Sequence, residues 1–132
     1  MSEARVQLRV NGQVVDLQVG TTEALLDTLR ERCGLTGTHQ GCDTAQCGAC
    51  TVRVDGQPIK SCNRLTLQTA GASVETIESL APEQGPLHPL QQAFSRHHAL
   101  QCGFCTPGFV MRALAMVDEN VPATPDAVRE AL

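Results

Sequence analysis

Large aromatic side chains are almost absent from this sequence of 132 residues, which contains no Trp, no Tyr and three Phe. Aromatic rings therefore contribute little buried apolar area, and a chain of this length forms one domain or two small ones without a large core. Small modules with thin cores usually need disulfides, metals or partner subunits for stability. The seven cysteines are for this reason the most informative part of the composition.

Several signals of location and partner are also absent. The N-terminus has no basic stretch followed by an apolar run, so it does not read as a secretory signal. No apolar segment approaches the roughly 18 residues that a membrane span requires. The formal charge is −4 and the Lys and Arg residues are scattered, which argues against a nucleic-acid partner. We expect a cytoplasmic, reducing setting, in which clustered cysteines act as ligands or redox groups rather than disulfides.

The cysteines are concentrated in one run, Gly41-Cys42-Asp43-Thr44-Ala45-Gln46-Cys47-Gly48-Ala49-Cys50, which Cys62 follows twelve positions later. A spacing of four residues and then two, with another Cys downstream, is the plant-type pattern of a two-iron two-sulfur (2Fe-2S) cluster. Structural zinc sites usually use two Cys-x-x-Cys pairs instead, so zinc is the weaker alternative. The glycines permit the tight folding that such a loop needs. The predicted cluster ligands are Cys42, Cys47, Cys50 and Cys62.

Cys102 and Cys105 form a further Cys-x-x-Cys pair. Alone, such a pair fits a redox dithiol, half a zinc site or half of a second cluster, and the residues leave these alternatives open. We expect Cys33 to be a small buried residue on the apolar face of a helix, because free Cys is among the most buried residue types. We expect His39 to be a solvated loop histidine. No arrangement of Ser, His and Asp or of paired carboxylates predicts a catalytic residue on this chain.

The first part of the chain has the alternation of apolar and polar residues that predicts strands. Asn11-Gly12 and Asp55-Gly56 are both typical of type I′ hairpin turns. Between the two hairpins we predict a helix that Thr21 or Thr22 caps and that Gly34 ends. The second hairpin returns the chain to Cys62, and a last strand is expected over residues 73–77. We therefore predict a β-grasp domain of the ferredoxin type over residues 1–78.

The second part of the chain changes to helical periodicity after a linker predicted over residues 79–88. Pro89 suits the first turn of a helix, and Thr106-Pro107 and Thr124-Pro125 each combine a cap with a first-turn proline. We predict an all-α domain over residues 89–132, and an α+β class for the whole chain. The face predicted to be buried on the middle helix consists of Val110, Ala113, Leu114 and Val117.

Longer motifs surround both cysteine groups and together cover nearly the whole chain. They are Gly34-Leu35-Thr36-Gly37-Thr38, the run from Gly41 to Cys50, Asp55-Gly56, Cys62, Thr76-Ile77-Glu78, His88-Pro89-Leu90-Gln91-Gln92-Ala93-Phe94 and Gln101-Cys102-Gly103-Phe104-Cys105-Thr106-Pro107-Gly108. With these motifs the chain resembles the small iron–sulfur subunit of the molybdenum hydroxylases. That is the xanthine dehydrogenase and aerobic carbon monoxide dehydrogenase family, in its separate-subunit bacterial form.

The resemblance implies a β-grasp domain followed by a helical bundle, each with one 2Fe-2S cluster. By similarity, the first four cysteines bind an outer cluster, and Cys102 and Cys105 belong to an inner cluster nearest the molybdenum. Gln101 matches the position that contacts the molybdopterin cofactor of a large partner subunit. The implied function is electron transfer from the molybdopterin centre through both clusters to FAD in a medium subunit. Alternative functions are a stand-alone 2Fe-2S ferredoxin and a structural zinc-binding adaptor.

The sequence departs from the family pattern at its C-terminal end. The family completes its inner cluster with a Cys-x-Cys pair shortly after the helix that begins here near Pro125, and the sequence stops at Leu132 before such a pair. The departure indicates either a truncation of the C-terminal part or an incomplete inner site that interrupts the electron path, and we favour truncation. The helical domain is then incomplete, and the second cluster lacks two ligands in this sequence.

Overall fold

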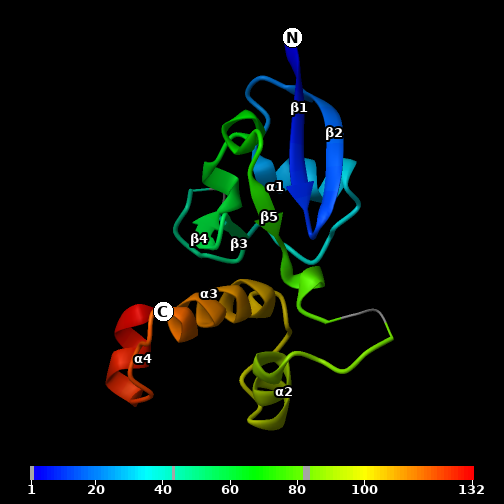
Figure 1. Cartoon of the computed structure of the whole chain (residues 1–132). Coiled ribbons are helices and arrows are strands. Elements are labelled where there is room, and N and C mark those ends of the chain that lie inside the picture. The colour runs from blue at the N-terminus through cyan, green and yellow to red at the C-terminus, as the bar shows by residue number, and fades with distance from the viewer. Residues whose placement is uncertain (1, 43, 82–83) are drawn as a thin grey trace.

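The computed structural model describes residues 2–42, 44–81 and 84–132. Met1, Asp43 of the cysteine run, and Pro82 and Glu83 of the expected linker lie outside these ranges. The class is α+β, as predicted: strands and short helices occupy residues 2–81, here called the sheet region, and longer helices occupy residues 84–132, here called the helical region (Figure 1).

The described strands form one mixed sheet in the order β2-β1-β5-β3-β4. The antiparallel neighbours are β1 with β2, β3 with β4, and β3 with β5, whereas β1 and β5 run parallel. The strand bounds are Glu3–Val10 (β1), Gln13–Gly20 (β2), Thr51–Val54 (β3), Gln57–Lys60 (β4) and Ser73–Glu75 (β5).

Both predicted hairpin turns are present. The φ angles are 49° at Asn11 and 84° at Gly12, and 50° at Asp55 and 82° at Gly56. Positive φ at both central residues defines the type I′ turn, whose twist matches that of the flanking strands. The second turn joins β3 to β4 and so brings the chain back toward the cysteine run.

A short helix, α1 (Leu25–Asp27), continues as a π-helical segment over Thr28–Arg32 and packs against the sheet. The predicted caps at Thr21 or Thr22 are wrong, because the helix starts after Ala24 without a side-chain cap. The backbone N–H of Leu25 instead donates to the carbonyl of Arg64 at 2.7 Å. The apolar core of the sheet region consists of Val6, Leu8, Val10, Val19, Leu25, Leu29, Val52, Val54 and Val74.

The helical region contains α2 (Pro89–Arg96), α3 (Thr106–Asp118) and α4 (Pro125–Ala131). The α4 start is as predicted, since the Thr124 hydroxyl accepts a hydrogen bond from the N–H of Ala127 at 3.2 Å. At α3 the cap position is held by Cys105, so Thr106 lies inside the helix rather than before it. No helix among the described residues is long and apolar enough to cross a membrane.

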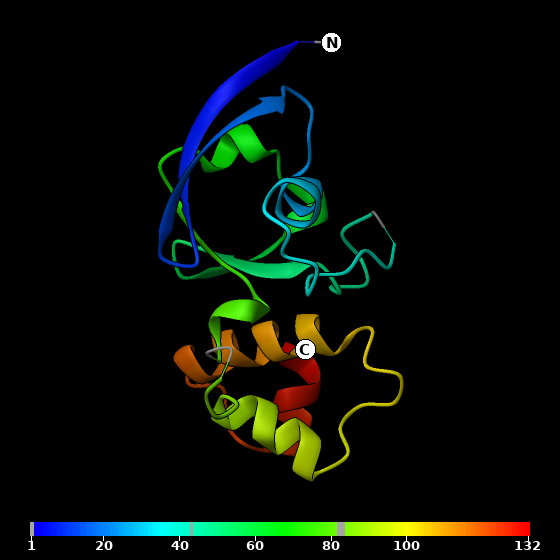
Figure 2. The same ribbon diagram turned by 90° about the vertical axis from the view of Figure 1, so that its right-hand side faces the viewer.

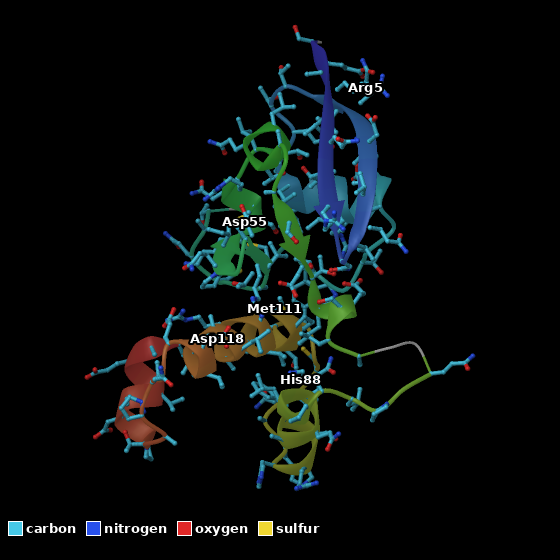
Figure 3. The ribbon with its side chains drawn as sticks, viewed as in Figure 1. Arg5, Asp55, His88, Met111 and Asp118 are labelled. Carbon is cyan, nitrogen blue, oxygen red and sulfur yellow. The ribbon has the colours of Figure 1, made fainter. Side chains whose placement is uncertain are left out.

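Helix α3 lies across one end of the sheet region and joins the two regions (Figure 1). Figure 3 shows Met111 and Asp118 on this helix, beneath the strands. The predicted buried face of α3 is wrong in part, because Val117 is 60% exposed whereas Met111 and Ala115 are buried. Apolar residues surround most of α3, so periodicity alone does not select the face. The close approach of Gly108 to the sheet region determines which face of α3 is buried.

That approach is very close. A Cβ atom at Gly108 would lie 2.2 Å from the carbonyl oxygen of Gly48 and 2.8 Å from the Cα of Ala49. Both of these are backbone atoms that cannot rotate away. A glycine is therefore required where α3 contacts the cysteine run.

Candidate metal centre

The cysteine run forms a loop between the π-helical segment and β3, and hydrogen bonds hold it from both sides. On one side the Arg30 guanidinium donates to the carbonyls of Thr36 and Thr38, each at 2.8 Å. On the other side the Lys60 ammonium of β4 donates to the carbonyl of Ala45 at 2.7 Å. The loop is thus anchored to α1 and its π-helical extension and to the sheet.

Two glycines let the loop fold tightly, as predicted. Gly48 has a φ of 75°, in the left-handed region that glycine adopts without strain. A Cβ at Gly41 would lie 2.8 Å from the sulfur of Cys47, so a side chain at this position would collide with a thiol. Glycine at position 41 therefore leaves room for the sulfur of Cys47.

Backbone N–H groups of the loop point at the sulfur of Cys42. Thr44, Gln46 and Cys47 donate to it at 3.3, 3.4 and 3.3 Å. Hydrogen bonds that favour the charged form lower a pKa. The pKa of Cys42 falls to about 6, first because of a hydrogen bond from the Thr44 side chain and then because of these backbone donors. The environment of Cys42 therefore suits a thiolate.

The same pattern continues at the other cysteines of the run. The N–H of Ala49 donates to the sulfur of Cys47 at 3.4 Å, and the N–H of Cys62 donates to the sulfur of Cys50 at 3.5 Å. Cys50 is 2% exposed. Hydrogen bonds of this kind are among the features that set the potential of an iron–sulfur cluster.

Cys62 lies in a short 3₁₀ helix (Ser61–Asn63) directly after β4. Burial raises the pKa of its thiol to about 11, and a hydrogen bond with the Cys50 thiol and the negative charges of Cys50 and Cys42 act in the same direction. These interactions with Cys50 and Cys42 show that the hairpin places Cys62 beside the cysteine run. A bound cation would offset the repulsion and allow all the thiols to ionise together.

The chemistry of this donor set fits a 2Fe-2S cluster, which binds four thiolates across two irons. The four thiols are Cys42, Cys47, Cys50 and Cys62, and amide N–H groups face the sulfurs of Cys42, Cys47 and Cys50. In the described ranges, no group of three ligand-type side chains is placed to hold a single metal ion.

Cys102 and Cys105 lie on the loop between α2 and α3, on the same side of the molecule as the cysteine run (Figure 2). Both are exposed, as is Gln101 beside them. Cys105 is the cap residue of α3, where the helix dipole favours a negative charge. The two cysteine groups are separate in the sequence and become neighbours through the docking of α3.

A cavity of about 400 Å³ lies between the two groups. Cys47 and Gly48 line it from the cysteine run, and Cys105, Gly108 and Phe109 line it from the helical region. Arg112 of α3 also faces this cavity.

His39 is not the solvated loop residue that we expected. It is half-buried, and its Nδ1 donates to the carbonyl of Phe104 at 2.7 Å. The two rings stack with centroids 4.5 Å apart and an interplanar angle of 14°. Phe104 is 65 residues away in the sequence, so no local pattern predicts this contact.

Cys33 is half-buried, with its pKa raised by burial. This partly matches the expected buried residue, and Cys33 takes no part in either cysteine group. Sequence reasoning also missed Lys60 and Gly108. Each contacts the cysteine run from a distant segment. Gly108 ends one of the motifs that carry the resemblance, but neither residue type indicates such a contact.

Comparison with known families identifies the class of protein. Residues 8–80 match the family described as "2Fe-2S iron-sulfur cluster binding domain", and residues 76–132 match the family described as "[2Fe-2S] binding domain". The chain is therefore a 2Fe-2S protein.

Individual relatives narrow the class. The chain is 50% identical to the caffeine dehydrogenase subunit gamma of Pseudomonas sp. (strain CBB1) over 84% of its own length and 66% of the relative's. It is 46% identical to the nicotine 6-hydroxylase small subunit of Paenarthrobacter nicotinovorans, over 96% of its own length and 76% of the relative's. The crystal structure of quinoline 2-oxidoreductase from Pseudomonas putida 86 superposes with a TM-score of 0.93 and 43% identity, over 99% of this chain and 80% of that one.

The chain belongs to the small iron–sulfur subunits of the molybdenum hydroxylases, the electron-transfer subunits of oxidoreductase complexes. This confirms the resemblance seen in the sequence. The relatives favour this function over a stand-alone ferredoxin and over a zinc adaptor.

Proposed function

We propose that this chain transfers electrons between a molybdopterin centre in a large partner subunit and FAD in a medium partner subunit. The 2Fe-2S groups supply single-electron transfer when bound, and the chain supplies their ligands. The observation that carries the proposal is the loop of residues 41–50, which meets Cys62 with its backbone N–H groups directed at sulfur. The seven free cysteines fit the reducing cytoplasm as its compartment.

For the outer cluster we propose Cys42, Cys47, Cys50 and Cys62 as ligands, on a β-grasp domain over residues 1–78. This assignment is supported by the low pKa of Cys42, which favours the thiolate that iron requires. It is supported as well by the match of this segment to a 2Fe-2S cluster binding domain.

For an inner cluster we propose Cys102 and Cys105 as two of the four ligands, on a helical domain that follows a linker over residues 79–88. The match of residues 76–132 to a second 2Fe-2S binding family supports this assignment. The exposure of both thiols and of Gln101 is what a site that faces a partner subunit needs. We propose Gln101 as the contact to the molybdopterin cofactor of the large subunit.

The proposal is tested on the complex isolated from cells with its partner subunits. Two 2Fe-2S clusters require about four irons and about four acid-labile sulfides per chain, together with two electron paramagnetic resonance signals after reduction. Zinc without labile sulfide, or a chain that elutes alone in gel filtration, would contradict the proposal.

Single cysteine variants then assign the ligands. Cys62→Ala is expected to remove one signal and about half of the iron, and Cys105→Ala is expected to remove the other signal. Cys33→Ala is the matched control, because it removes a half-buried thiol outside both groups and should leave the iron content unchanged. Loss of iron in the control would show that the assay reports folding rather than ligation.

A further inference from the structure

One residue, His39, contacts both cysteine groups, one through its side chain and the other through its backbone. The His39 imidazole donates to the Phe104 carbonyl at 2.7 Å and stacks on the Phe104 ring, and Phe104 lies between Cys102 and Cys105. The backbone N–H of His39 donates to the carbonyl of Ala49, between Cys47 and Cys50, at 3.4 Å. A carbonyl oxygen can only accept, so Nδ1 carries the proton in this arrangement.

We propose that His39 is a positioning residue that holds the Cys102–Cys105 loop against the outer-cluster loop and thereby sets the geometry of the inner cluster. This inference rests on the proposed function, because it assumes that Cys102 and Cys105 bind a cluster. The hydrogen bond and the ring stack of the His39 side chain are both with Phe104, which is not a proposed ligand. It acts through the backbone and the ring of Phe104.

The loop before α3 has little else to hold it. Within the described residues, the hydrogen bond from His39 is the one that residues 100–104 receive or donate. Gly103 has a φ of 87°, so the backbone beside Phe104 follows a path that most residues avoid. Phe104 is 48% exposed, so apart from its stack on His39 it is not enclosed by a core. The conformation of this loop therefore depends strongly on His39.

His39 is itself well anchored. The Arg30 guanidinium donates to the carbonyl of Thr38, the preceding residue, at 2.8 Å. The Thr38 side chain is 1% exposed. The imidazole thus extends from a rigid part of the sheet region, as a positioning residue must.

Helix α3 has contacts with the sheet region that do not involve His39. That helix is held by the close contact of Gly108 with Gly48 and by the ion pair of Arg53 with Asp118 at 3.3 Å. Loss of the imidazole should therefore loosen the loop that carries Cys102 without releasing the helix that follows Cys105. This separates a positioning role from a role in overall folding.

Four variants of the complete complex test the proposal. His39→Ala removes both the hydrogen bond and the stack, His39→Phe keeps a ring without the donor, and His39→Gln keeps a donor without the ring. Phe104→Leu keeps the acceptor carbonyl and removes the ring on the other side. His97→Ala is the matched control, because His97 is an exposed histidine at the end of α2.

Two measurements on the reduced complex, made without substrate, report the role. Proteolytic cleavage within residues 100–104 should be about 5-fold faster in His39→Ala, the effect expected from one lost hydrogen bond that holds this loop. The g-values and line width of the inner-cluster resonance should change in His39→Ala and return toward wild type in His39→Gln. The outer-cluster resonance and the His97→Ala control should stay as in wild type.

Wild-type spectra and a wild-type cleavage rate in His39→Ala would overturn the proposal, and so would an equal change at both clusters. If His39→Ala fails to assemble, His39→Phe and Phe104→Leu are judged by the same two measurements. A wild-type complex without clusters would instead refute the proposed function. The two failures are therefore distinguishable.

Discussion

The sheet region and the helical region present their cysteines in different ways. In the sheet region a buried apolar core supports the loop, and backbone N–H groups surround the sulfurs. In the helical region α2 and α4 have no buried residue, and Cys102 and Cys105 are exposed. The first cysteine group is supported by its own region, whereas the loop of the second contacts the sheet region through Phe104 and His39.

The largest expected effect tests whether the outer site stabilises its own region. Cys62→Ala should lower the melting temperature of the sheet region by about 10 °C or more, because the free energy of metal binding is also folding free energy. Cys105→Ala should leave that transition nearly unchanged. Scanning calorimetry measures the melting temperature of both variants. Equal shifts of this temperature would contradict the difference drawn between the two cysteine groups.

The next effect tests the contact between the regions. Gly108→Ala should destabilise the protein by about 2 kcal/mol, because the new Cβ collides with backbone atoms of Gly48 and Ala49. Helix propensity alone would favour Ala by about 1 kcal/mol, so the sign of the change distinguishes the collision from local preference. Urea denaturation gives the value, and Val117→Ala on the exposed face of α3 is the control, expected to stay within about 0.5 kcal/mol.

A smaller effect tests the internal support of the sheet region at acid pH. The Arg32 guanidinium donates twice to the Glu23 carboxylate at 2.8 Å and lowers the pKa of Glu23 from its ordinary 4.5 to about 2. The Thr28 hydroxyl donates to the same carboxylate. Since the folded pKa is lowered, the stabilisation is complete above about pH 4.5 and is lost as the pH falls toward 2.

Glu23→Gln should therefore cost about 1–3 kcal/mol at pH 7, and the difference from wild type should shrink between pH 4.5 and 2. Urea denaturation across this range measures it. Asp16→Asn is the matched control, because Asp16 pairs with Arg5 at 2.7 Å on the exposed surface and should have no measurable effect. A constant difference between wild type and Glu23→Gln at all pH values would refute the role of the ionised carboxylate.

The smallest expected effect concerns the ion pair between the regions. Arg53 of β3 contacts Asp118 at the end of α3 at 3.3 Å, and the Asp118 side chain is 56% exposed. A double-mutant cycle with Arg53→Met and Asp118→Asn should give a coupling of about 0.2–1 kcal/mol that decreases with added salt. A coupling above this range would show that charge contributes more to the docking of α3 than the apolar contact around Gly108.

Sequence patterns predicted the features that depend on interactions between neighbouring residues. The two hairpins follow from Asn11-Gly12 and Asp55-Gly56, whose positive φ angles suit few other residues. The cysteine run is equally local, because three ligands within nine residues define a spacing that can be read directly. Errors began where a choice depended on distant segments, as at the helix cap, which the Arg64 carbonyl made unnecessary.

The sequence by itself determined the α+β class, the positions of the main elements and the family, because turn residues, periodicity and cysteine spacing act over short distances. The tertiary structure alone decided which face of α3 is buried, that Gly108 contacts the cysteine run, and that His39 joins the two cysteine groups. These contacts link residues some 60 positions apart. They depend on close packing and backbone acceptors, for which no residue type along the chain is a signal.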